Sequence, residues 1–152
     1  MSSRFPDHFS AVAPAYAQSR PTYPAALFDW LASRCAAREL AWDCGAGSGQ
    51  ASLALGARFT RVIATDASAE QIARATPHAR IEYRVAAAER SGLETACADL
   101  ITVAQALHWF DLDRFWPEVR RVARSAALFA AWTYGPLEVD GDAVDALVQG
   151  FR

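Results

Sequence analysis

The sequence predicts an α/β fold, a doubly wound and mainly parallel sheet, and three observations predict it. Short apolar runs alternate with segments of helical periodicity along the chain. An apolar run at 39–44 enters a glycine-rich turn and then a helix-like segment. A near-continuous apolar run at 99–104 is typical of a central parallel strand buried on both faces.

Length and composition describe one ordinary globular domain. The chain has 152 residues, of which 53% are hydrophobic and 21% are charged. The formal net charge of −2 gives no electrostatic reason to expect a nucleic acid or a membrane surface as partner. No apolar run is long enough to span a bilayer, and residues 1–8 lack the apolar core of a secretory signal. Three cysteines without C-x-x-C spacing indicate reduced thiols, a cytoplasmic location and no metal site.

The first helix is expected over residues 25–35, where apolar residues recur at helical spacing. Pro24 fits its first turn, where a missing N–H costs little. The preceding segment, 1–24, contains Pro14 and Pro21 as well, which argues against one continuous helix there. Two interpretations stay open for this segment: an irregular lead-in, or a lid of aromatic residues and Arg20 over a ligand.

The strand at 39–44 leads into three glycines between positions 45 and 49. Glycines let the backbone bend sharply and approach a ligand closely. A helix from about residue 50 to 58 would direct unpaired N–H groups at the bend, which suits a nucleotide-like or carboxylate-bearing ligand. We expect Asp43 to fix the turn by accepting its N–H groups. An ordinary tight turn is the alternative, and Gln50 departs from the third glycine of the dinucleotide pattern.

The second strand is predicted over 61–66 and ends at Asp66. This acid follows the glycines at close to the ~20-residue distance from which an acid reaches a ribose diol. A helix cap is the alternative role for Asp66. However, Ser68 begins a capping-box pattern and is the better cap for a helix over 69–75. The alternating pattern of 81–85 predicts a half-buried edge strand.

The fourth strand, 99–104, opens into Gln105-Ala106-Leu107-His108-Trp109-Phe110-Asp111. Ligands of open α/β sheets bind at the carboxyl ends of strands where the strand order reverses, so this turn and the glycine turn should border one cleft. A core aromatic cluster with a satisfied histidine is the alternative. Next we expect a helix over 112–124, either kinked or started by Pro117, and a fifth strand over 128–134. Residues 142–150 read as a short amphipathic helix.

The stretch Trp42-Asp43-Cys44-Gly45-Ala46-Gly47-Ser48-Gly49 resembles the first motif of the class I S-adenosylmethionine-dependent methyltransferases, which have a Rossmann-like fold. The turn at 105–110 resembles the fourth motif of a small-molecule subgroup, methyltransferase type 11, that includes trans-aconitate methyltransferase-like enzymes. Residues 16–24 resemble its lid, and 118–122 resemble its Glu-x-x-Arg-Val helix. The family usually continues with Pro-Gly-Gly, where this chain has Ser125-Ala126-Ala127, and then with a helical insertion and an antiparallel strand pair. The resemblance therefore implies a sheet that is truncated after its fifth strand.

The resemblance implies S-adenosyl-L-methionine as cofactor and a small-molecule methyl acceptor, with a carboxylate or hydroxyl oxygen as the target. It implies a lid over residues 1–24 and a cofactor-binding domain over 25–152. The implied cofactor-binding residues lie in the lid and in the turns after the strands: Tyr16, Arg20, Asp43, Gly45, Ala46, Gly47, Asp66, Ala67, Ala88, Glu89 and Gln105. His108 is the candidate catalytic residue, and His108 and Trp109 are the candidate substrate-binding residues. His108 would take the proton of a hydroxyl acceptor, or only position a carboxylate acceptor.

Two rival functions stay open. A nicotinamide-dependent oxidoreductase shares the glycine corner and the ribose acid, although Gln50 and the His108-Trp109 pair disfavour it. A non-catalytic domain would bind S-adenosylmethionine without methylating anything. The fifth strand should also be an exposed sheet edge, which would permit a homodimer.

Overall fold

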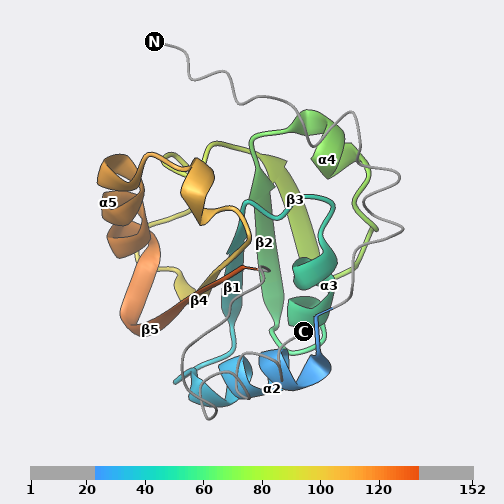
Figure 1. The fold of residues 1–152 in the computed structure, drawn as a ribbon. Coiled ribbons are helices and arrows are strands. Elements are labelled where there is room, and N and C mark those ends of the chain that lie inside the picture. Colours follow the sequence, from blue (N-terminus) through green and yellow to red (C-terminus); the bar gives the residue numbers. More distant parts are fainter. Residues whose placement is uncertain (1–22, 134–152) are drawn as a thin grey trace, which may run out of the picture.

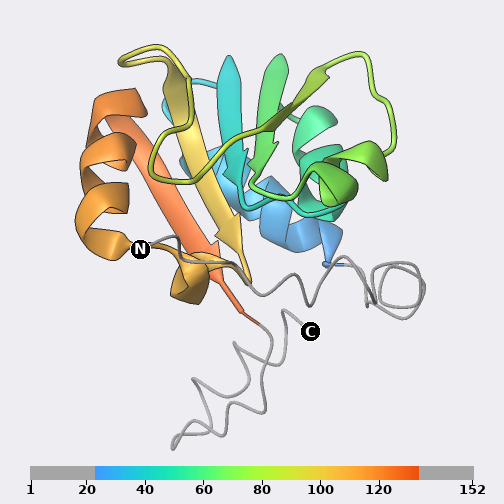
Figure 2. The same cartoon turned by 90° about the horizontal axis from the view of Figure 1, so that it is seen from above.

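The computed structural model describes residues 23–133, which form a five-stranded sheet with helices packed on it (Figures 1 and 2). The strand order is β3-β2-β1-β4-β5, and the strand pairs are parallel. The strands are β1 (Leu40–Cys44), β2 (Arg61–Asp66), β3 (Ile81–Val85), β4 (Ala98–Ala104) and β5 (Ala123–Trp132). The helices are α2 (Ala25–Arg34), α3 (Gln50–Gly56), α4 (Ala69–Ala73), the 3₁₀ turn η1 (Leu107–Trp109) and α5 (Leu112–Val122). The predicted doubly wound parallel sheet is confirmed.

Some expectations lie outside the described residues. These are the lid residues Tyr16 and Arg20, the strand break at Gly135 and the helix expected over 142–150.

The sheet separates two hydrophobic cores, and successive residues of β1 contribute to opposite ones. Leu40, Trp42 and Cys44 join the core that includes Phe115 of α5, whereas Ala41 joins the core that includes α2 and α3. This alternation follows from the two-residue period of a strand. All residues of β1 are buried, so the glycine turn starts from a strand end that is held on both faces of the sheet.

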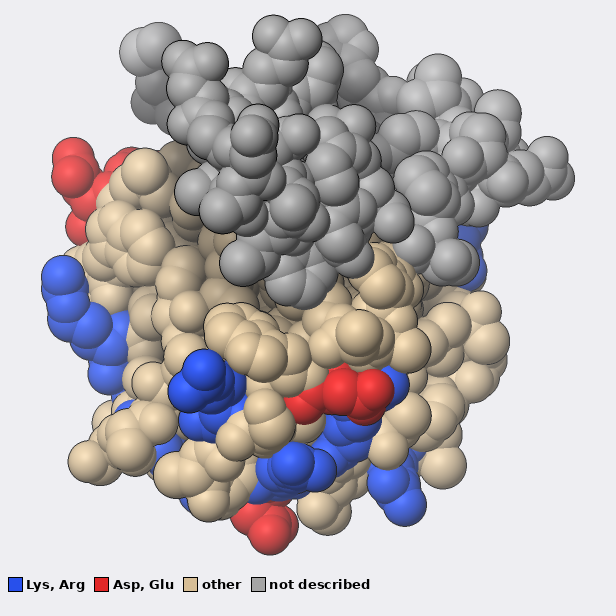
Figure 3. Space-filling view, turned by 60° about the horizontal axis from the view of Figure 1, so that its bottom comes forward, with Lys and Arg blue, Asp and Glu red and all other residues tan. Residues whose placement is uncertain are grey.

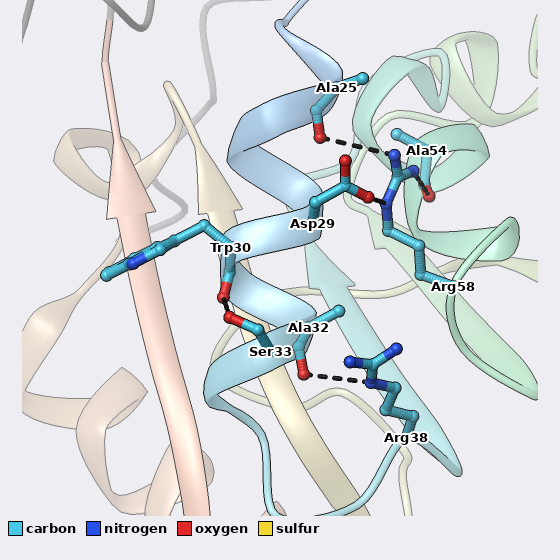
Figure 4. A network of polar contacts seen from close by, with 8 residues as sticks. All are labelled: Ala25, Asp29, Trp30, Ala32, Ser33, Arg38, Ala54 and Arg58. Atoms are coloured by element: carbon cyan, nitrogen blue, oxygen red, sulfur yellow. Dashed lines mark hydrogen bonds and ion pairs between the residues drawn. The ribbon is translucent and has the colours of Figure 1, made fainter.

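Helix α2 is attached to α3 by Arg58, which follows α3 (Figure 4). Its guanidinium donates to the Asp29 carboxylate at 2.7 Å and to the carbonyl of Ala54 at 2.8 Å. It also lies 5.8 Å from the centre of the Phe28 ring, close enough for a cation–π contact. Arg58 therefore fixes the packing of two helices on one face of the sheet.

The surface seen in Figure 3 carries interspersed acidic and basic side chains.

Strands β2 and β3 have the predicted bounds, and Ser68 caps α4 by accepting the Gln71 N–H at 3.3 Å. Helices α3, α4 and α5 end at Gly56, Ala73 and Val122, slightly before the expected ends, where terminal turns are irregular. Pro117 lies inside α5. None of the helices between residues 23 and 133 has the length and hydrophobicity that crossing a bilayer requires.

Strand β5 begins at Ala123 and not, as expected, at 128. Ala123 already pairs with Ala98, and the register then shifts between Ala98 and Leu100. The chain absorbs this irregularity at Ala126, whose φ is +67°. The expected boundary was wrong because the strand already begins where Ala123 meets Ala98, and a contact between such distant segments leaves no local pattern in the sequence. Within 23–133, β5 pairs only with β4 and is an edge strand; the homodimer through this edge stays a prediction.

Replacing Ala126 with glycine should stabilise the protein by about 0.5–1 kcal/mol. The left-handed conformation costs a residue with a Cβ about 1–2 kcal/mol, and the larger unfolded-state entropy of glycine offsets part of that gain. Denaturant unfolding measures the difference. Ala127→Gly is the matched control and should destabilise, since no positive φ favours glycine there. Equal effects of the two substitutions would contradict strain at Ala126.

Candidate functional site

Three neighbouring strands end at one edge of the sheet, and each is followed by predicted site residues. β2 ends with Asp66, β1 leads into the glycine turn, and β4 leads into residues 105–111. In the sheet, β2 and β3 lie on one side of β1, and β4, which follows them in the chain, lies on the other side of β1. The space above β1 and β4 is thus the point where the strand order reverses, the usual ligand site of such sheets.

The glycine turn lies directly against the turn that follows β4. Gly45 has a φ of +67°, and a Cβ on it would lie 2.7 Å from the Cβ of Ala106 and 3.1 Å from the ring of Phe110. Gly49 has a φ of +87°, and a Cβ there would lie 2.8 Å from the Tyr83 ring. The turn needs glycine at these two positions for both conformation and space. The expected proximity of the two turns is confirmed.

Asp66 holds the glycine turn to the end of β2. One carboxylate oxygen accepts the Gly47 N–H at 2.8 Å, and the other accepts the Ser68 N–H at 2.8 Å. Burial raises the pKa of this carboxyl group, and the two N–H donors lower it less than burial raises it, so the pKa stays above its usual value. An ionised carboxylate has about four acceptor positions, so two remain for a ligand.

Asp43 has two partners that the sequence did not suggest. Its side chain is fully buried, and one oxygen accepts the Ser52 hydroxyl at 2.6 Å while the other accepts the Thr102 hydroxyl at 3.0 Å. The Gly47 N–H of the glycine turn is bonded to Asp66. Asp43 therefore ties β1 to α3 and to β4 beneath the site. Sequence reasoning missed Ser52 and Thr102; the signal was a threonine inside the apolar run of β4.

Gln105 lies at the end of β4 in the left-handed region, with a φ of +62°. Such a conformation is uncommon for a residue with a side chain, and it concentrates at functional sites. The Gln105 amide donates to the hydroxyl of Tyr23 at 2.9 Å, and its backbone N–H donates to the Trp132 carbonyl at 2.7 Å. The Tyr23 ring is 8% exposed and packs edge-on against Trp132 and Phe28. It anchors the chain before α2 and offers little open surface to a ligand.

The turn after β4 carries the candidate substrate residues on η1. His108 and Trp109 are both exposed, and their ring centres lie 4.7 Å apart. Two other candidate residues lie in the turn after β3: Ala88 is buried in the core, and the Glu89 carboxylate accepts the Asp111 N–H at 2.8 Å. Ala67, next to Asp66, is exposed.

The cysteines and acids of the described residues form no metal centre. No group of three His, Cys, Asp or Glu side chains between 23 and 133 is arranged to hold a metal ion. All three cysteines are free thiols, and burial raises the pKa of the Cys44 thiol well above its usual value. Cys44 therefore fills space beside the glycine turn and is not an activated nucleophile.

The fold and the arrangement of the turns define a class I, Rossmann-like methyltransferase domain. The family model described as "Methyltransferase domain" matches residues 42–131. The chain is 41% identical over 138 residues to a protein of Dictyostelium discoideum named as a methyltransferase, covering 90% of this chain and 52% of the relative. The chain belongs to the class I S-adenosylmethionine-dependent methyltransferase family.

Two further comparisons agree with this assignment. A structure described as a type II methyltransferase from Anaeromyxobacter dehalogenans has 56% identity and a TM-score of 0.75, with 86% of this chain and 55% of that chain covered. A protein of Saccharomyces cerevisiae named as an S-adenosylmethionine-dependent methyltransferase is 27% identical over 128 residues, covering 78% of this chain and 44% of the relative. The chain thus spans about half the length of the curated relatives it matches.

Proposed function

We propose that the protein binds S-adenosyl-L-methionine and transfers its methyl group to a small molecule, at a carboxylate or hydroxyl oxygen. The observation that carries this proposal is the meeting of three strand ends at one edge. There Asp66, the glycine turn and the turn bearing His108 lie side by side, and Gly45 contacts Ala106 directly. The family to which the chain belongs supports the choice of cofactor. The free thiols support a cytoplasmic location.

The described residues fit an adenosyl cofactor. Asp66 keeps acceptor positions for two ribose hydroxyls after receiving two backbone N–H groups. Gly45 makes room for the turn after β4, and at Gly47 the backbone has no side chain between it and a ligand, so the glycine turn can hold the amino-acid portion. Of the other implied residues in the described part of the chain, Ala46, Ala67, Ala88 and Gln105 would contact the cofactor, and Asp43 and Glu89 would support the site through the bonds described above. The exposed Trp109 offers an aromatic face, which attracts a positive charge.

The bound cofactor would supply an electrophilic methyl group with a good leaving group, and no metal is needed. The protein then has to hold the acceptor oxygen in line with that methyl group, which is catalysis by proximity and orientation. His108 projects from η1 beside Trp109 and is the group we assign to the acceptor. It would accept the proton of a hydroxyl acceptor, whereas for a carboxylate it would only position an oxygen that is already ionised.

Calorimetry with S-adenosylhomocysteine and with NAD tests the cofactor. We expect binding of S-adenosylhomocysteine only, because Gln50 replaces the third glycine of the dinucleotide pattern. Preferential binding of NAD would overturn the proposal in favour of an oxidoreductase. Radiolabelled methyl transfer to a panel of small carboxylic acids and alcohols then separates an enzyme from a domain that only binds the cofactor.

Replacing His108 with alanine should lower methyl transfer at least tenfold for a hydroxyl acceptor and leave the affinity for S-adenosylhomocysteine unchanged. The size follows from the usual contribution of a general base, about 10²–10⁴-fold. The assay is labelled methyl transfer alongside calorimetry. His78→Ala, which changes an exposed histidine far from this edge, is the matched control. Unchanged turnover in the His108 variant would remove it from the reaction.

A further inference from the structure

The segment that joins β3 to β4 is attached to α5 at several points. The Glu118 carboxylate, on α5, accepts the backbone N–H of Ser91 at 2.6 Å and its hydroxyl at 2.8 Å. Arg121 donates to the Thr95 hydroxyl at 3.2 Å, and its carbonyl accepts the Ala96 N–H at 2.8 Å. Residues 86–97 contain no helix or strand of their own apart from one isolated bridge, so these bonds to α5 define their position.

Glu89 makes the contact that lies nearest to the site. Its carboxylate accepts the N–H of Asp111 at 2.8 Å. Asp111 is the residue before α5, and only Phe110 separates it from the 3₁₀ turn that carries His108 and Trp109. A negative charge is also favourable there, since a helix N-terminus carries a partial positive charge. The Glu89 side chain thus connects the segment after β3 to the turn that carries His108 and Trp109.

We propose that Glu89 is a positioning residue, which couples the cofactor-side segment after β3 to the acceptor-side turn at 107–111. This proposal rests on the proposed function of the site. The resemblance implied Glu89 as a cofactor-binding residue, whereas in this proposal it acts through the Asp111 backbone and not through a bond of its own to the cofactor. A cofactor that orders Ala88 and Glu89 would thereby also order the turn that presents His108, which links cofactor binding to readiness for the acceptor.

Amide hydrogen exchange of residues 107–112 tests the coupling, measured with and without S-adenosylhomocysteine. In the unmodified protein we expect the ligand to slow exchange in this turn. In Glu89→Ala the turn should exchange at least tenfold faster without ligand, and the ligand should no longer slow it. Glu89→Gln keeps an acceptor oxygen and should restore most of the protection. Glu94→Ala, an exposed acid on the same segment, is the matched control.

The donor of this hydrogen bond, the Asp111 backbone N–H, can be removed with Asp111→Pro. The φ of −76° at Asp111 and the extended conformation of Phe110 both suit a proline, so the substitution deletes the N–H with little strain. Asp111→Ala controls for the loss of the side chain. In the proline background, Glu89→Ala should have no further effect on exchange of 107–110. An undiminished effect would show that Glu89 acts through something other than this bond, and would overturn the proposal.

Calorimetry keeps the two proposals apart. We expect Glu89→Ala to change the affinity for S-adenosylhomocysteine less than threefold. A loss above tenfold in both Glu89 variants, with unchanged exchange in the turn, would make Glu89 a direct cofactor ligand and overturn the positioning role. If the unmodified protein did not bind S-adenosylhomocysteine, the proposed function would fail. Amide exchange measured without ligand would then still decide whether Glu89 holds the turn. The variants to compare are Glu89→Ala, Asp111→Pro and the double variant that combines them.

Discussion

Replacing Gly45 with alanine is expected to destabilise the protein by about 3 kcal/mol and to weaken binding of S-adenosylhomocysteine. The left-handed φ of +67° alone costs about 1–2 kcal/mol. The new Cβ would also lie 2.7 Å from the Cβ of Ala106, an atom fixed to the backbone of the substrate turn. Overpacking of this kind costs about 1–3 kcal/mol, because the two turns have to move apart. Denaturant unfolding and calorimetry measure the two effects.

The chain provides a close control in Gly92. Its φ of +76° resembles that of Gly45, but a Cβ there would meet nothing within 4 Å. Gly92→Ala should therefore show the cost of conformation without the cost of overlap. In the double variant Gly45→Ala with Ala106→Gly, part of the lost stability should return, since the clashing Cβ is gone. Equal losses for Gly45→Ala and Gly92→Ala would mean that the two turns are not in contact.

Replacing Asp66 with asparagine should lower the affinity for S-adenosylhomocysteine by about 30–100-fold, or about 2–2.7 kcal/mol. Both carboxylate oxygens already accept a backbone N–H, from Gly47 and from Ser68. An asparagine would turn an NH₂ group toward one of these donors, which disturbs the glycine turn as well as the proposed ribose site. Calorimetry at neutral pH measures the loss. Glu70→Gln, in the first turn of α4, controls for a general change in charge.

Asp66 also predicts a pH dependence. Burial holds the pKa of its carboxyl group above the usual value, and the ionised form is the one that accepts two hydroxyls. As the pH falls through this raised pKa, the carboxylate is protonated and affinity for S-adenosylhomocysteine should fall. The decline should begin at a higher pH than for an ordinary aspartate and be absent in Asp66→Asn. Affinity that is independent of pH and of the substitution would exclude Asp66 from the cofactor site.

Much of the fold could be predicted because it depends on local patterns. The apolar runs of β2 and β3 gave their bounds, and Ser68 could be recognised as the cap of α4 from four residues of sequence. The beginning of β5 could not, because it depends on how Ala123 pairs with Ala98 across the sheet. The lack of a breaking residue between α5 and β5 removed the local signal on which such a boundary depends.

The sequence by itself determined the alternation of strands and helices, the glycine turn after β1 and the polar residues that follow β2 and β4. These are properties of neighbouring residues, and periodicity and turn chemistry report them directly. Only the tertiary structure decided the partners of the acids. Asp43 meets Thr102 across 59 residues of sequence, Asp66 accepts the Gly47 N–H of the glycine turn, and Glu89 reaches Asp111. Which donor a buried carboxylate accepts depends on the register of strands and the path of loops, and no local pattern encodes that geometry.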